Sequence, residues 1–256
     1  MFDFNGFPLE AHQLIILASC AVVIGASKTC LPGMSILAVP VFASILSPKI
    51  SVGVVLPMLI FADIFAITYY HKHAQWRNVL RIIPPTLVGL GIGYYFMDKV
   101  DNRQLQLIIG VIVLAMLAMW SWQNFRTKSK IEEDGKVHPA YVLFLGLAVG
   151  ISTMMANAAG PIVMIYLLSL GLGKKKFLGT GAWFIFIINW IKLPLNVSLG
   201  LITLQSLKLD LLLFPMVLIG ALTGIFALKW IPQKVFTTTI IILALASAVK
   251  LILTSI

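Results

Sequence analysis

Two long apolar runs in this chain are each interrupted by a short stretch with polar, Gly and Pro residues, and these breaks constrain the fold most. The breaks lie at residues 27–33 of the run 14–46 and at residues 154–161 of the run 141–172. Each leaves apolar arms of about 12 to 17 residues, whereas a bilayer core of ~30 Å needs about 20 helical residues. Free backbone groups at membrane depth need protein or water around them, so the two breaks predict one shared internal site.

Composition places the chain in a membrane. Its residues are 60% hydrophobic and only 11% charged, which is too few polar residues to cover a soluble domain. The formal net charge is +10, but the cations form short clusters between apolar runs, as in the cytoplasmic loops of membrane proteins. We therefore expect a polytopic protein with the lipid bilayer as a partner, and no nucleic-acid partner.

The order of the apolar runs is repeated in the two halves. Each half has a broken run followed by three continuous runs, which cover residues 51–70, 79–97 and 105–125, and then 177–199, 207–228 and 235–253. Pro84-x4-Gly89-x3-Gly93 in the first half has the spacing of Pro215-x4-Gly220-x3-Gly224 in the second. Glycines four apart allow close helix packing, so packing alone explains them, while their repetition indicates internal duplication, a frequent feature of secondary transporters.

The positive-inside rule favours inverted repeats. If each broken run returns to its own side and the N-terminus lies outside, the cytoplasmic loops carry these cations: Lys72, Arg77, Arg81, Arg126, Lys128, Lys130, Lys136, Lys174, Lys175, Lys176, Lys229 and Lys234. The outside loops keep Lys49, Lys99, Arg103 and Lys208. Counting each broken run as one crossing divides the same cations evenly, which the rule disfavours. Two short crossings per broken run would give the same sidedness as a hairpin and remain an alternative.

We therefore predict an all-α polytopic membrane protein of two inverted repeats, each a broken helix hairpin plus three transmembrane helices. The first repeat covers residues 1–125, a cytoplasmic connector covers 126–138, and the second repeat covers 139–256.

The breaks favour an anion site. Pro32 and Pro161 suit the first turn of a helix, so each downstream arm would begin inside the membrane with unpaired N–H groups and partial positive charge. The expected substrate-binding residues are Lys28, Thr29, Gly33, Ser35, Asn157, Gly160 and Ile162. Polar side chains there could instead only cap the broken helices, and the Lys28 side chain could extend to the headgroup region.

Three polar residues deep in continuous runs are candidates for coupling or for structural pairing. Asp63 is expected to be the only acid deep in an apolar segment, where it could carry a proton. Asn189 occupies nearly the inverted-repeat position of Asp63, so the two could approach each other. Lys192 could pair with Asp63, although their depths differ by about 10 Å by helical rise.

The motifs resemble the TauE/SafE family of sulfite exporters, also called the toluene sulfonate uptake permease family. The second half carries Asn157-Ala158-Ala159-Gly160-Pro161, Tyr166-Leu167-Leu168, Gly179-Thr180-Gly181-Ala182-Trp183 and Asn189-x2-Lys192-x-Pro194. The first half carries Gly33-x6-Pro40, Ala62-Asp63 and His73-x2-Trp76. The resemblance implies a transporter of small sulfur-containing or organic anions in the bacterial cytoplasmic (inner) membrane, driven by a proton or other ion gradient.

Transport of a small anion such as sulfite, a sulfonate or a related organic acid is therefore the leading hypothesis. A passive anion channel built on the same helix dipoles is an alternative. An intramembrane enzyme using His71, His73 and Asp63 is a further one, but no nucleophile, metal or nucleotide motif is present in the sequence. We expect no enzymatic activity, no metal and no cofactor, and a homodimer is compatible with the sequence.

Overall fold

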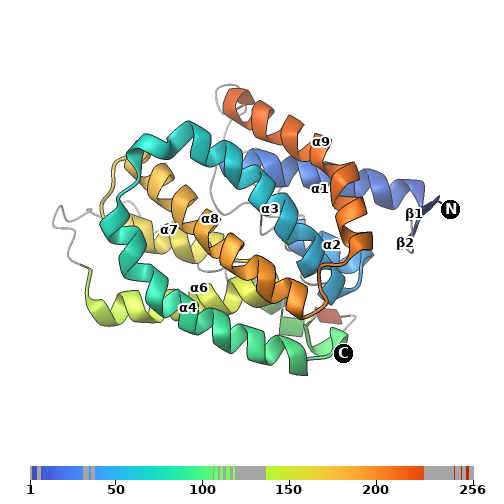
Figure 1. Cartoon of the computed structure of the whole chain (residues 1–256), viewed down its shortest axis with the longest axis horizontal. Helices are drawn as coiled ribbons and strands as arrows, with labels where there is room; N and C mark the ends of the chain where they lie inside the picture. The colour runs from blue at the N-terminus through green and yellow to red at the C-terminus, as the bar shows by residue number, and fades with distance from the viewer. Residues whose placement is uncertain are drawn as a thin grey trace.

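The computed structural model describes residues 2–4, 7–30, 35, 38–105, 107–108, 110–111, 114–115, 118, 137–227, 245, 249 and 252–253. The described residues are nearly all helical, apart from an N-terminal antiparallel pair of strands, β1 (Phe2–Phe4) and β2 (Phe7–Leu9) (Figure 1). The helices are α1 (Ala11–Cys30), α2 (Ala38–Ile45), α3 (Pro48–Tyr70), the 3-10 helix η2 (His71–His73), α4 (Trp76–Lys99), α6 (Pro139–Ala156), α7 (Gly160–Ser169), α8 (Lys174–Ser198) and α9 (Leu204–Ala227).

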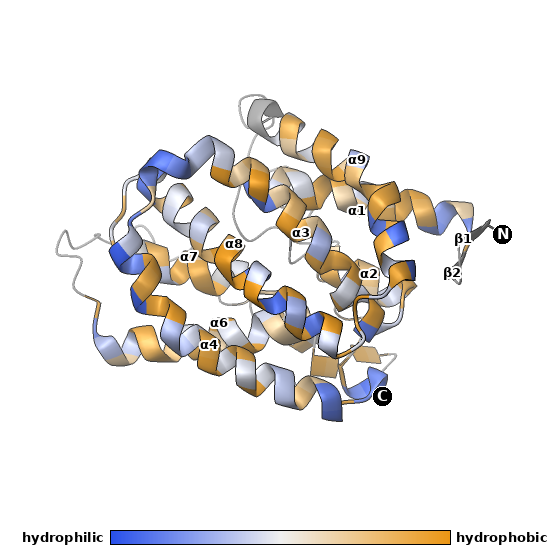
Figure 2. Ribbon diagram, viewed as in Figure 1, coloured by the Kyte–Doolittle hydropathy of each residue, from blue (hydrophilic) through white to orange (hydrophobic). Residues whose placement is uncertain are grey.

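Six helices of the described part are long and apolar enough to cross a membrane, which confirms the predicted all-α polytopic class. They are α1, α3, α4, α6, α8 and α9. Figure 2 shows that apolar residues dominate these helices and that hydrophilic residues gather at the turn between α3 and α4. Most of the runs 105–125 and 235–253 and of the connector 126–138 lies outside the described residues, so the predicted boundaries of the two repeats stay a prediction.

Local sequence signals set where α3 and α6 begin. Ser47 precedes Pro48, and its hydroxyl accepts a hydrogen bond from the Ile50 N–H at 3.4 Å. His138 precedes Pro139 in the same way, and its ring nitrogen accepts from the Ala140 N–H at 3.2 Å. A capping side chain followed by Pro satisfies or removes donors that the first turn leaves unpaired.

The second broken run forms a hairpin that returns to its own end of the bundle. The residues before α6, Val137 and His138, line the same surface hollow as Leu170 and Leu172, which follow α7. The Tyr166 hydroxyl of α7 also donates to a backbone carbonyl at the start of α4, at 2.8 Å. A re-entrant hairpin and two short crossings both return to their own side, so the choice between these two alternatives stays a prediction.

The two hairpins start from opposite ends of the bundle. In Figure 1, α1 begins at the end where α2 leads into α3, whereas α6 begins at the other end, where α3 leads into α4. This opposition is what inverted repeats require. The helices that would complete each repeat lie largely outside the described residues, so the inverted-repeat relation stays a prediction.

The arms of the hairpins are less equal than the sequence indicated. α1 has 20 residues and α6 has 18, whereas α2 has 8 and α7 has 10. The expected arms of about 12 to 17 residues are therefore wrong, because the polar residues after position 26 continue α1 instead of ending it. The Ser27 hydroxyl donates to the Ile24 carbonyl at 2.7 Å, a bond that satisfies the side chain within the helix.

The repeated Pro-Gly-Gly motifs pack each half against the hairpin of the other. Gly89 of α4 lies so close to α6 that a Cβ would be 2.4 Å from the Leu147 carbonyl oxygen. Gly220 of α9 lies so close to α1 that a Cβ would be 2.0 Å from the Val22 carbonyl oxygen. The same contact thus occurs twice with the halves exchanged, and the packing interpretation of these glycines is confirmed.

Candidate functional site

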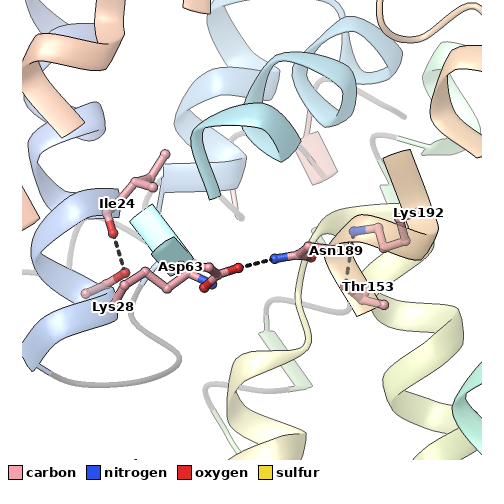
Figure 3. A network of polar contacts seen from close by, with 7 residues as sticks. Ile24, Lys28, Asp63, Thr153, Asn189 and Lys192 are labelled. Atoms are coloured by element: carbon pink, nitrogen blue, oxygen red, sulfur yellow. Dashed lines mark hydrogen bonds and ion pairs between the residues drawn. The ribbon is translucent and has the colours of Figure 1, made fainter. Parts of the chain in front are cut away.

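An ion pair joins the end of α1 to the middle of α3. Lys28 Nζ lies 2.6 Å from Asp63 Oδ1. The other carboxylate oxygen, Oδ2, accepts a hydrogen bond from Asn189 Nδ2 of α8 at 2.7 Å. Figure 3 shows the three side chains as one line of contacts between α1 and α8. The approach of Asn189 to Asp63 that the sequence indicated is present, and Lys28 is the cation that pairs with the acid.

A second contact joins the end of α6 to α8. Lys192 Nζ donates to Asn157 Oδ1 at 2.5 Å and to Thr153 Oγ1 at 3.1 Å, and Asn157 Nδ2 donates to the Val52 carbonyl of α3 at 2.9 Å. Asn157 follows the last residue of α6 in the left-handed conformation, with φ 50° and ψ 30°, which asparagine tolerates better than most residues. The break of the second run is therefore centred on Asn157, and the preceding residues 154–156 are the last turn of α6.

The two contacts occupy equivalent positions in the two halves. Asn157 follows Lys28 by 129 positions, and Lys192 follows Asp63 by the same 129. In each half, the last turn or the C-cap of the long hairpin helix contacts the middle of the following long helix. The residue types differ, because the first half has a cation with an acid and the second has an amide with a cation.

Both contacts border a small cavity of about 30 Å³ inside the bundle. That volume is room for about two water molecules. Its lining comes from both halves and consists of Lys28, Ser35, Leu59, Asp63, Ala66, Tyr70, Thr153, Asn157, Ala159, Gly160, Leu178, Gly181, Ala182, Ile185 and Asn189. The polar members of this lining are almost all buried in the bundle. Lys192 is not in the lining and lies behind two of its members, Thr153 and Asn157.

The first turn of α7 also faces this cavity. α7 begins at Gly160, which lines the cavity, and has Pro161 in its first turn, as the sequence indicated. The Ala159 carbonyl accepts the N–H of Val163 at 3.0 Å. The backbone N–H groups of Gly160 and Ile162 lie in the first turn of α7, so no carbonyl within the helix accepts their hydrogen bonds. They leave partial positive charge at this side of the cavity.

The remaining predicted binding residues are placed as follows. Ser35 lines the cavity. Thr29 lies at a helix contact, where its hydroxyl donates to the Ala221 carbonyl of α9 at 3.0 Å and its own carbonyl accepts from the Tyr70 hydroxyl. Ile162 is buried but is not part of the lining. Gly33 lies outside the described residues.

The structure also shows polar groups that the sequence pattern did not single out. Tyr70 closes one side of the cavity and could not be assigned from sequence, because it ends an apolar run where an interfacial residue is expected. Asp210 of α9 is fully buried in the bundle, so Asp63 is not the only buried acid among the described residues, while its depth in the membrane stays a prediction. In the sequence, Asp210 lies only a few residues into an apolar run, where a charged residue at the membrane interface is expected.

The comparison with protein families agrees with this architecture. The sequence model of the family described as sulfite exporter TauE/SafE matches residues 17–251. The chain belongs to the TauE/SafE family. A search of curated proteins and a search of solved structures find no match. Membership in a family of sulfite exporters, together with six helices able to cross a membrane, makes this TauE/SafE protein a membrane transport protein.

Proposed function

We propose that this TauE/SafE protein is a secondary transporter of a small anion, such as sulfite, a sulfonate or a related organic acid. The substrate site is the cavity between the two hairpins. The observation that carries the proposal is the gathering of buried cations, polar hydrogens and a helix N-terminus around one small cavity.

The chemistry of this lining suits an anion. The N-terminus of α7 offers backbone N–H groups and partial positive charge, and anions bind readily at such helix ends. Lys28 adds an ammonium group at the cavity wall. In a site from which water is excluded, each of these interactions is stronger than in water. The apolar members of the lining, such as Leu59 and Ile185, offer water no hydrogen-bonding groups.

The small size of the cavity supports a carrier over an open channel. A space for about two waters has no room for a continuous water-filled pore, which favours a carrier that rearranges to admit the substrate. The short arms α2 and α7 are the natural moving parts, because each is held by fewer turns than a full span. Saturable counterflow in proteoliposomes would distinguish a carrier from a channel.

The enzyme alternative gains no support from the geometry. His71 and His73 form part of η2 at the end of α3 and are not in the cavity lining. Among the described residues, no cluster of His, Cys, Asp and Glu is arranged to hold a metal ion. The family supports a place in the bacterial cytoplasmic membrane, and the cation distribution among the loops supports an N-terminus outside.

Filling the cavity tests the location of the site. Gly181 of α8 lines the cavity, and a Cβ there would meet only the flexible end of Leu167. Gly181→Leu should therefore fold and abolish both the thermal stabilisation by sulfite or methanesulfonate and the counterflow of labelled substrate. Gly91→Leu is the matched control, because nothing lies within 4 Å of a Cβ at that position of α4. Equal transport by the two variants would place the substrate elsewhere.

A further inference from the structure

The two equivalent contacts at the cavity differ in their charge balance. Lys28 and Asp63 neutralise each other at 2.6 Å. Lys192 is completely buried, and its contacts, Asn157 and Thr153, are neutral. Among the described residues, no carboxylate lies within ion-pair distance of Lys192, since Lys28–Asp63 is the one ion pair found between helices there. With these three groups charged, the site carries a net charge of one positive unit.

A buried cation without an acid partner points to an anion that completes the pair. Taking an ammonium group out of water costs several kcal/mol, and neutral hydrogen bonds offset only part of that cost. Intramembrane ionisable residues therefore usually face a partner or a substrate pathway. Lys192 continues the face of α8 that lines the cavity, because it follows Asn189 by three residues and Ile185 by seven.

The contacts of Lys192 also leave polar hydrogens for the cavity. A lysine ammonium can only donate, so Thr153 Oγ1 accepts from it and the hydroxyl hydrogen of Thr153 remains to donate elsewhere. Asn157 accepts from Lys192 through Oδ1 and gives one amide hydrogen to the Val52 carbonyl. Its second amide hydrogen remains available. Both residues line the cavity, and Figure 3 shows Lys192 pointing toward Thr153.

We infer that Lys192 supplies the uncompensated positive charge of the substrate site, one layer behind Thr153 and Asn157, and thereby sets its preference for a monovalent anion. Lys28 and Asp63 form an internal neutral pair. This inference rests on the proposed function and adds to it the charge class of the substrate. A small monovalent oxyanion, such as a sulfonate, would balance the site, whereas a divalent one would leave a net negative charge in a low-dielectric space.

Substitutions that change the charge of the site in single units test the inference. Lys192→Met brings the net charge to zero and should weaken methanesulfonate binding by about 10- to 100-fold, the scale of losing the attraction of one unit charge a few ångströms away in a partly buried site. Lys192→Arg keeps the charge and should retain most of the affinity. The pair Lys28→Met with Asp63→Asn removes both charges of the ion pair, so the net charge is unchanged and the ratio of sulfate to methanesulfonate affinity should stay as in the original protein.

The ratio of sulfate to methanesulfonate affinity is a second measurement, because a lysine with a purely structural role would not affect it. Asp63→Asn alone raises the net charge to two positive units, so the ratio of sulfate to methanesulfonate affinity should rise by at least about tenfold. Affinities would be measured by calorimetry on purified, monodisperse protein in detergent. If Lys192→Met does not fold, the other variants and the sulfate-to-methanesulfonate ratio still decide the question.

The outcomes separate the inference from the proposed function. If the original protein binds neither anion nor sulfite, both are overturned. If it binds methanesulfonate and Lys192→Met binds equally well, or if the Lys28→Met and Asp63→Asn double variant changes the sulfate-to-methanesulfonate ratio, the function stands and Lys192 does not carry the charge. An unchanged selectivity ratio in Asp63→Asn would also overturn the inference.

Discussion

Replacing Gly89 by alanine should destabilise the bundle through a backbone clash between its two halves. A Cβ at Gly89 would lie 2.4 Å from the Leu147 carbonyl oxygen, whereas ordinary contacts begin at 3.4 Å. The α4 and α6 backbones must therefore separate locally by about 1 Å. The opposing residue is Gly150, whose own Cβ would lie 2.3 Å from a carbonyl of α4. No side chain in this contact can rotate away, so the backbone has to move.

The expected cost is that of an overpacked core, about 1 to 3 kcal/mol. For a chain of this length, such a loss corresponds to a decrease of roughly 2 to 10 °C in the apparent unfolding temperature. Gly91→Ala is the matched control on the same helix, because a Cβ there meets nothing within 4 Å. It should leave the temperature unchanged or raise it slightly, since alanine favours helix over glycine by up to about 1 kcal/mol.

The assay is thermal unfolding of the purified variants in one detergent, followed by tryptophan fluorescence. Gly220→Ala provides an independent repeat of the test at the contact between α9 and α1, where the predicted overlap with Val22 is larger. If Gly89→Ala and Gly91→Ala unfold at the same temperature, the close approach of α4 to α6 does not limit stability and the reasoning fails.

Three further predictions concern topology, coupling and binding. A reporter fused after Lys176 should be cytoplasmic and one fused after Leu201 periplasmic; finding both on one side would contradict the inverted-repeat arrangement. Asp63→Asn should abolish gradient-driven transport while methanesulfonate still binds, and concentration of substrate at the normal rate by this variant would make Asp63 structural. Lys28→Met should weaken anion binding by about 1 to 3 kcal/mol, because it leaves Asp63 unpaired beside the substrate, and Asn157→Ala should cost somewhat less. Calorimetry in detergent measures both, and unchanged affinity in both variants would mean that the breaks do not hold the substrate.

The class of this protein follows from the sequence alone, because the bilayer limits what an apolar chain can form. Spanning segments must pair their backbone groups internally, so long apolar runs become helices whatever their tertiary context. The two breaks were also readable, since a cluster of Gly, Pro and polar residues inside an apolar run interrupts the backbone hydrogen bonding of a spanning helix. Even the approach of Asn189 to Asp63 was expected from the sequence, because the two residues lie at nearly corresponding positions of the two halves.

Only the tertiary structure decided where the breaks begin and which charges are paired. Ser27 and Lys28 are as polar as residues of a loop, but they continue α1. The Ser27 hydroxyl donates to the Ile24 carbonyl of the same helix, and the Lys28 ammonium pairs with the Asp63 carboxylate of α3. The spacing of apolar residues cannot reveal a partner such as Asp63, which lies on another helix. The sequence therefore identified two membrane-embedded lysines, but it could not show that Asp63 neutralises Lys28 and leaves Lys192 with neutral partners alone.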